Sequence, residues 1–445
     1  MKLEQRQETI KNRVASQKSL LSPIRRIPPE ILGQIFIVLQ SISEPICFGD
    51  DALENTELWT LLNVCRFWRT VAMSYSELWS HFAITRQPFS RPSEKGVDIL
   101  AQQTLQFTKD CISYSHTRPL HFVFHANEDY LGAAELLATE SRRWCSVRFN
   151  NLAVLRVLEP RILGHLPNLC SLTIDGLGKE WDLQTGPLQA FQQAPSLLRL
   201  TLFDLEQPQS RFILPWRQIT QFSSFQLRQF LPILNLMPSL VEFKSTEDIC
   251  EFDEIQERIH LPNLERLEVM SNSPTTNQIF DALQTPKLTA LRLFSKRGFS
   301  RIYAAAVVEM IKTSGCCLNS LSVSDYAIDS IFRMLREVRD LEELTFGVPS
   351  GNGRLLPQLR KLVLRKCAPE LNLGTCLLRM VRGRNSVTEV LPYLPQTLHE
   401  ISIGLSSVPE SQFLRSWKDI VRQLRDADVV QIELNGLFDF IYPTA

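Results

Sequence analysis

"LPNLERLEV", residues 261–269, carries the pattern that decides the fold. A proline precedes a leucine, and two further apolar residues then alternate with charged ones. Alternation of this kind predicts a strand with one buried face. The phrase recurs along the chain, often with its proline, and we call its first leucine the anchor residue. The anchor residues are Leu169, Leu197, Leu240, Leu264, Leu288, Leu318, Leu341, Leu359 and Leu398.

The spacing of the anchor residues indicates a repeat architecture. Successive anchors lie 28, 43, 24, 24, 30, 23, 18 and 39 residues apart, and the larger intervals leave room for degenerate copies. Segments between anchors, such as residues 275–284 and 303–312, carry the apolar stripe of a helix. One strand and one helix per repeat predict an α/β solenoid over residues 118–441, with parallel strands on its concave face and helices outside.

This region resembles a leucine-rich-repeat array, whose repeats are about 20–29 residues long. The resemblance is to a degenerate array, because the Asn or Cys that usually follows the strand is present only as Asn272 and Cys367. The same slot elsewhere holds Leu177, Leu205, Lys296, Tyr326 and Pro349. The alternative is a generic α/β domain with coincidental leucines, which nine copies with a shared proline preference disfavour.

Near the N-terminus, "IPPEILGQIFIVL" (residues 27–39) predicts a short amphipathic helix. Pro28 and Pro29 suit the first turn of a helix, and Glu30 lies near the positive end of its dipole. The apolar positions that form the stripe are Ile27, Ile31, Leu32, Ile35, Phe36 and Leu39. Residues 57–84 add similar stripes, and such a small unit needs the next domain or another protein to cover its apolar surface.

The two stretches together resemble an F-box. That family shows an Ile-Pro opening, a Glu-Ile-Leu helix, a Val-Cys-x-x-Trp helix and a later Trp. The matching residues in this sequence are Ile27, Pro28, Glu30, Ile31, Leu32, Ile35, Phe36, Val64, Cys65, Trp68, Arg69 and Trp79. "ESRRWCSVRF" (residues 140–149) further resembles large fungal F-box families.

In the F-box family these helices dock on the Skp adaptor of a cullin–RING ubiquitin ligase. A helix that docks into a partner's groove makes its contacts through apolar residues at i, i+3 and i+4 spacing, as found here. The adaptor-binding residues that the resemblance implies are Pro28, Ile31, Leu32, Ile35, Val64, Cys65 and Trp68. The alternative role for each is the unit's own core, most evenly balanced for Ile35, Phe36 and Trp68.

The repeats would then hold a protein substrate. Along each predicted strand the leucines point inward, and the alternate positions point to the open face. Those positions include Thr173, Asp175, Thr201, Phe203, Glu268, Met270, Arg292, Phe294, Val363 and Arg365. Phe203, Met270 and Phe294 would suit a binding patch, and a solvated or internally covered face is the alternative.

The balanced charge and the lack of familiar catalytic motifs disfavour several classes of function. Lys plus Arg and Asp plus Glu both number 48 in 445 residues, which gives no general attraction to nucleic acid or to a membrane. The sequence contains no H-E-x-x-H, G-x-S-x-G or G-x-x-x-x-G-K motif, and its ten cysteines include no C-x-x-C pair. We expect reduced thiols, no metal or cofactor, and a location in the cytoplasm or nucleus. His121 and His125 suit ordinary strand positions.

We therefore expect a non-catalytic protein of four parts: a helix or tail (1–21), an all-α F-box (22–85), a linker with a helix near 97–113 (86–117), and the repeats (118–441). The predicted function is substrate recognition in a Skp–cullin–F-box ubiquitin ligase, with the Skp adaptor, the cullin and RING subunits and an unknown substrate as partners. The alternative is a leucine-rich-repeat scaffold that does not drive ubiquitination.

Overall fold

The structure is a computed structural model, and its described residues fall into two compact units. The N-terminal unit is residues 1–172 with 189–196, and the C-terminal unit is residues 173–188 with 197–445. The residues described are 27–42, 46–48, 57–85, 94–176, 186–205, 208–225, 231–247, 258–271, 277–295, 301–324, 341–346, 361–367, 400–405, 422 and 431–435. The predicted helix or tail at residues 1–21 lies outside them.

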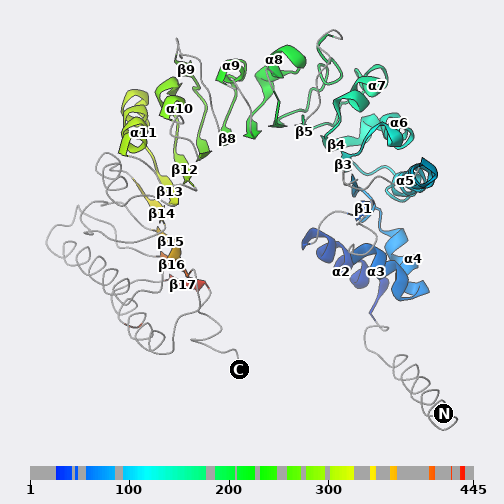
Figure 1. The fold of residues 1–445 in the computed structure, drawn as a ribbon. Coiled ribbons are helices and arrows are strands. Elements are labelled where there is room, and N and C mark those ends of the chain that lie inside the picture. Colours follow the sequence, from blue (N-terminus) through cyan, green and yellow to red (C-terminus); the bar gives the residue numbers. More distant parts are fainter. Residues whose placement is uncertain are drawn as a thin grey trace. The chain divides into compact units, whose positions relative to one another are not determined.

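The N-terminal unit begins with helices α2 (Pro29–Ile42), α3 (Glu57–Val64) and α4 (Arg66–Ser74) (Figure 1). Two strands accompany these helices, β1 (Ile46–Phe48) and β2 (His81–Thr85), and they pair in parallel. The expectation of an all-α unit over residues 22–85 was therefore wrong. The apolar run Phe82–Ile84 is buried, as expected for a strand with a neighbour on each side.

The rest of this unit alternates helices with strands. Its helices are α5 (Glu94–Tyr114), which contains the helix predicted near 97–113, α6 (Leu131–Thr139) and α7 (Leu152–Ile162), with 3₁₀ turns η2 (Glu128–Tyr130) and η3 (Ser141–Arg143). Its strands are β3 (Leu120–His125), β4 (Trp144–Phe149) and β5 (Ser171–Asp175), whose last residues belong to the C-terminal unit. β2, β3 and β4 are parallel neighbours.

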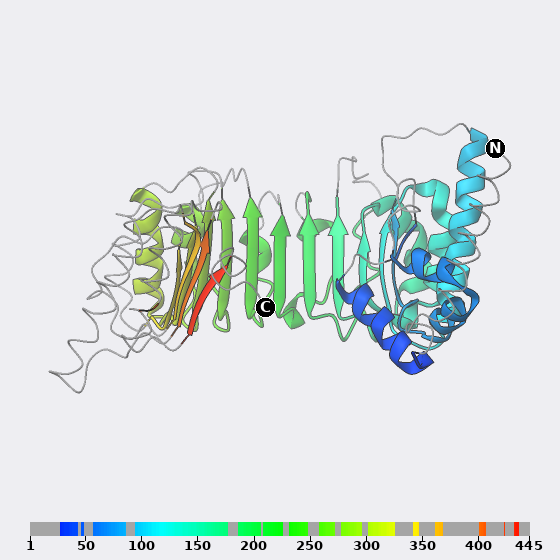
Figure 2. The ribbon, with the colours of Figure 1, turned by 90° about the horizontal axis from the view of Figure 1, so that it is seen from below.

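In the C-terminal unit each main-sheet strand pairs in parallel with the next (Figure 2). These strands are β6 (Arg199–Phe203), β7 (Gln221–Phe225), β8 (Glu242–Glu247), β10 (Arg266–Ser271), β12 (Ala290–Ser295), β13 (Ser320–Ser324), β14 (Glu343–Phe346), β15 (Lys361–Cys367), β16 (Glu400–Leu405) and β17 (Gln431–Asn435). A small separate sheet joins β9 (Ile259–His260) and β11 (Leu283–Gln284).

The helices of this unit lie along one face of its strands (Figure 1). They are α8 (Pro208–Arg211), α9 (Leu231–Leu234), α10 (Asn277–Ala282) and α11 (Arg301–Ser314), with the 3₁₀ turn η5 (Trp216–Gln218). α11 ends where Gly315 adopts a φ of 62° and donates its N–H to the Ile311 and Lys312 carbonyls. Glycine suits this left-handed position because it has no Cβ.

The nine predicted phrases all form strands, and each anchor residue lies two positions before its strand. One backbone arrangement links most of them in the C-terminal unit. In this arrangement, the backbone carbonyl of the residue that follows one anchor accepts two hydrogen bonds of 2.8–3.0 Å. Their donors are the backbone N–H groups of the two residues that follow the next anchor along the chain. The accepting carbonyls belong to Leu198, Thr220, Val241, Glu265, Thr289 and Asn319.

This arrangement reveals a copy that the leucine pattern missed. Ile219 occupies an anchor position, is fully buried, and precedes β7 by two residues. It divides the 43-residue interval after Leu197 into steps of 22 and 21 residues. In "ITQFSSF", isoleucine, phenylalanine and serine replace the leucines, so the phrase was not recognised in an interval that leaves room for it.

The same backbone link occurs in the N-terminal unit, where tryptophans take anchor positions. The His121 N–H donates to the Ser80 carbonyl, and the Cys170 N–H donates to the Cys145 carbonyl. The residues before those carbonyls are Trp79 and Trp144, both buried. Each indole N–H donates to the carbonyl seven residues earlier, that of Ala72 (3.0 Å) or Leu137 (2.9 Å). The end of the predicted F-box is thus built like the strand units that follow it.

Candidate functional site

Helices α2, α3 and α4 form a small core of their own. Phe36 is 1% exposed, and its ring lies 5.2 Å from that of Trp68. Their other buried residues are Leu32, Leu58, Leu61, Leu62, Val71 and Ala72. This core accounts for one apolar stripe of the sequence, and it fixes the outward direction of the remaining apolar residues.

Tyr75, which follows α4, packs against α2 and forms a hydrogen bond with it. A Cβ on Gly33 would lie 2.0 Å from the Tyr75 ring, so only glycine leaves room for the ring over this turn. The Tyr75 hydroxyl donates to the Glu30 carbonyl at 3.2 Å. At the far end of α2, the Gln40 side-chain amide donates to the Leu78 carbonyl at 2.9 Å. Both ends of α2 are therefore tied to the segment after α4.

The junction between α3 and α4 is also fixed by polar contacts. Cys65 adopts an extended backbone between the two helices, and its carbonyl accepts the Arg69 N–H at 3.1 Å. The Arg69 Nε donates to the Leu62 carbonyl in the last turn of α3, at 2.9 Å. The sharp connection holds Val64 and Phe67 at the surface.

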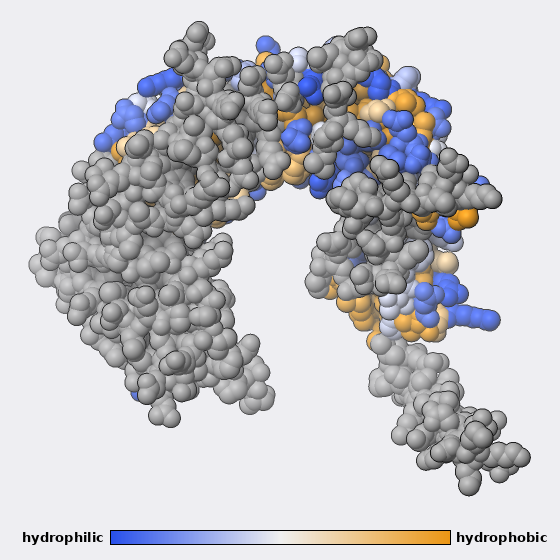
Figure 3. All heavy atoms as spheres, in the orientation of Figure 1, coloured by the Kyte–Doolittle hydropathy of each residue, from blue (hydrophilic) through white to orange (hydrophobic). Residues whose placement is uncertain are grey.

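An exposed apolar face remains outside this core. Ile31 is 53% exposed, Ile35 is 39% exposed and Val64 is 53% exposed. The large exposed apolar residues on these helices, among the side chains that the structure describes, are Ile31, Ile35, Val38, Leu39, Val64 and Phe67, and we call this set the helical face. Figure 3 shows hydrophobic surface over this part of the molecule. An i, i+4, i+7, i+8 spacing on α2 suits a helix that docks into a partner's groove.

Residues 24–85 match the F-box-like family model. This match supports an F-box protein, and the segment spans the three helices, β1 and β2. F-box domains generally bind Skp-type adaptors. A search of curated proteins finds no match to the chain.

The F-box segment exposes some of the predicted adaptor-binding residues and buries another. Pro28, Ile31, Ile35 and Val64 are exposed, whereas Cys65 and Trp68 are half-buried. Leu32 is only 1% exposed, so its prediction as a surface contact is corrected to a core position. One residue along α2 turns a side chain by about 100°, which separates Leu32 from Ile31.

Val38, Leu39 and Phe67 belong to the helical face but were not among the predicted adaptor-binding residues. The signal for the first two was present, because Ile31, Ile35, Val38 and Leu39 share one helical stripe. Phe67 had no such signal, since its exposure depends on the turn at Cys65.

A second candidate surface is the strand face of the C-terminal unit opposite its helices, which we call the strand face. Phe203, Phe225, Met270 and Phe294 are half-buried there. Phe203 and Phe225 stack with ring centroids 4.2 Å apart and an interplanar angle of 9°. Met270 lies in register with Phe294. Half-exposed aromatic and Met side chains of this kind are enriched at protein interfaces.

Charged side chains occupy the neighbouring rows of the strand face. Glu242 pairs with Lys244 at 3.1 Å and with Arg266 at 3.2 Å, and Glu268 pairs with Arg292 at 3.7 Å. Burial works to raise the pKa of Glu242, but the hydrogen bonds and charges of Lys244 and Arg266 outweigh it and hold this pKa below its usual value. These groups therefore give the face a fixed pattern of charge.

The predicted substrate-binding residues divide into three groups. Thr173, Thr201, Phe203, Glu268, Met270, Arg292 and Phe294 are half-buried or exposed. Asp175 is 3% exposed, so its prediction as an outward-facing residue was wrong, and it lies at the end of β5 with both Ile174 and itself buried. The side chains of Val363 and Arg365 lie outside the described residues. Phe225 and Lys244 were missed.

In the described part of the chain, no group of three or more His, Cys, Asp or Glu side chains could hold a metal ion. No helix in that part is long and apolar enough to cross a membrane.

Proposed function

We propose that this chain is the substrate-recognition subunit of a Skp–cullin–F-box ubiquitin ligase. The observation that carries the proposal is the helical face. It lies within the segment that matches the F-box-like family, and it stays exposed while the same helices bury a different set of residues. A Skp adaptor would cover it, and would link the chain to the cullin and RING subunits.

We also infer that the region after the F-box is a degenerate leucine-rich-repeat array. The recurrent anchor residues and the backbone link between consecutive copies support this inference. The strand face would bind the substrate, because it combines aromatic side chains with paired charges. A rigid array tolerates exchange of outward residues without loss of its leucine core.

The proposed mechanism is proximity. One end of the chain holds the ligase machinery, the other holds the substrate, and the substrate's lysines meet the charged conjugating enzyme at a high effective concentration. The chain itself would perform no bond chemistry. Such a subunit would work in the cytoplasm or the nucleus.

The test is to reconstitute the full-length chain with a Skp adaptor, a cullin and a RING subunit. We expect a stable four-subunit assembly that transfers ubiquitin, first to the F-box chain itself when no substrate is supplied. An adaptor complex that never recruits the cullin would instead favour the alternative, a scaffold that does not drive ubiquitination. A chain that binds no adaptor would contradict the ligase proposal and would leave a scaffold that binds only other proteins.

A further inference from the structure

Two cysteines of the N-terminal unit lie against each other. Cys145 follows the anchor residue Trp144, and Cys170 follows the next anchor residue, Leu169. Their sulfur atoms are 3.2 Å apart, and both residues are half-buried and therefore reachable by small molecules. The two cysteines occupy equivalent positions in consecutive copies, so the backbone link between copies brings them together.

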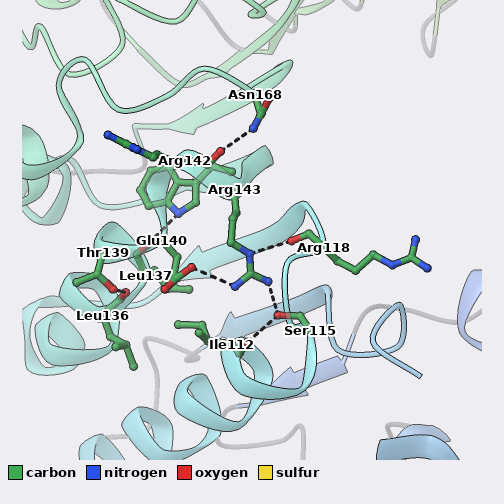
Figure 4. Close-up of polar contacts among 11 residues, drawn as sticks. Ile112, Ser115, Arg118, Leu136, Leu137, Thr139, Glu140, Arg142, Arg143 and Asn168 are labelled. Carbon is green, nitrogen blue, oxygen red and sulfur yellow. Dashed lines mark hydrogen bonds and ion pairs between the residues drawn. The ribbon is translucent and has the colours of Figure 1, made fainter. Parts of the chain in front are cut away.

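The surrounding contacts hold the pair in place. The Cys170 N–H donates to the Cys145 carbonyl at 2.9 Å, and the Cys170 thiol donates to the same carbonyl at 3.1 Å. Just upstream, the Asn168 side-chain amide donates to the Arg142 carbonyl at 2.7 Å, as Figure 4 shows. The two chain segments are thus joined by hydrogen bonds at the cysteines and just upstream of them.

Arg143 fixes the first of these segments further (Figure 4). Its guanidinium donates to the Arg118 carbonyl at 3.0 Å and to the Ser115 hydroxyl at 2.6 Å, and it pairs with Glu140 at 3.1 Å. The turn before Cys145 therefore has little freedom to carry its sulfur away from Cys170.

We propose that Cys145 and Cys170 form a reversible oxidation site for peroxides. One thiolate attacks the peroxide O–O bond, which gives a sulfenic acid and releases one water from hydrogen peroxide. The second thiol then displaces the sulfenic oxygen as a second water, and an S–S bond forms. The two sulfurs lose two electrons and the thiols lose two protons, while the peroxide is reduced to two molecules of water.

Only a small movement is needed to form the bond. A disulfide is about 2.05 Å long, so the sulfurs, 3.2 Å apart, must approach by roughly 1 Å. Disulfides in reducing compartments are usually transient and redox-sensing. The bond would join residues 25 positions apart in the sequence, Cys145 and Cys170, and the segment between them contains α7. Oxidation should therefore restrict opening of this part of the unit.

The experiment treats the reduced full-length chain with hydrogen peroxide, blocks the remaining thiols with an alkylating reagent, and analyses a tryptic digest by mass spectrometry. The expected product links the peptide 144–148 to the peptide 162–179 and disappears on reduction. The half-buried Cys65 and the exposed Cys317 serve as internal comparisons, and both should remain mainly alkylatable under conditions that convert the pair.

Two variants complete the test. Cys145→Ser and Cys170→Ser should each abolish the linked peptide, and peroxide should raise the melting temperature of the wild-type chain but not of either variant. Full alkylation of Cys145 and Cys170 after peroxide treatment would overturn the proposal, as would linkage of either cysteine mainly to other cysteines. The wild-type digest decides the question even if a variant fails to fold.

Discussion

The helical face and the strand face differ in how buried and exposed residues follow one another along the sequence. On α2, a core residue and an exposed residue are adjacent in sequence, as Leu32 and Ile31 show. On strands such as β6, β7 and β10, inward and outward residues alternate, and the outward ones carry aromatic rings and paired charges. The first surface is apolar and suits one kind of partner. The second is mixed, and its chemistry varies from strand to strand.

The largest predicted effect is a difference in stability between substitutions at two adjacent residues of α2, Leu32 and Ile31. Leu32→Ala should lower the free energy of unfolding by about 2–5 kcal/mol, because it leaves a cavity in the helical core. Ile31→Ala removes an exposed side chain and should change this free energy by less than about 0.5 kcal/mol. Urea denaturation of the full-length chain and both variants measures the difference. Equal losses would show that Ile31 is also a core residue.

The next largest effect concerns Trp79 and Trp144, and it tests whether the end of the F-box and a later strand unit use the same tryptophan hydrogen bond. Trp79→Phe and Trp144→Phe each remove the indole hydrogen bond to a backbone carbonyl, that of Ala72 or Leu137. Each carbonyl keeps a backbone N–H donor, so each variant should lose about 0.5–1.5 kcal/mol of stability, the net contribution of one hydrogen bond. Denaturant unfolding provides the measurement, and Trp59→Phe serves as the control because its indole nitrogen has no hydrogen-bond partner among the residues that the structure describes. A loss at only one of the two anchor tryptophans would break the equivalence.

The smallest effect concerns the charges of the strand face. The pKa of Glu242 is lowered in the folded chain, so its ionised form contributes stability at neutral pH. That contribution should be lost as the pH falls below the usual glutamate value of 4.5 and through the lowered folded pKa. Urea unfolding at pH 7 and at acidic pH should show a smaller pH-dependent loss for Glu242→Gln than for the wild type. The exposed Glu265→Gln variant is the control, and it should keep the wild-type dependence.

The sequence predicted the elements better than their packing. The alternation after each anchor residue was sufficient to locate nine strands, because one face of each strand must be buried in leucine. It missed β7, where Ile219, Phe222 and Ser224 take the leucine positions. It also gave no indication that Trp79 and Trp144 act as anchor residues, since this depends on a backbone link between distant segments.

The candidate sites were predicted in part, for a related reason. The stripe on α2 is wide enough to cover a core and a docking surface at once, so periodicity alone could not assign Leu32 and Ile31 to different roles. Asp175 follows the strand alternation but lies at a strand end, where the chain leaves the sheet and the alternation no longer determines exposure. Ion pairs such as Glu242 with Arg266 link different strands, and they require the register between strands.

The most direct test of the account is the affinity of the full-length chain for a Skp adaptor, measured by isothermal titration calorimetry. The double variant Ile31→Asp with Ile35→Asp should weaken binding at least about 100-fold, because two charges would enter an apolar interface. The control variant Val157→Asp changes an equally exposed apolar residue on α7 and should bind like the wild type. Unchanged affinity in a folded double variant would contradict the assignment of the helical face as the adaptor-docking surface.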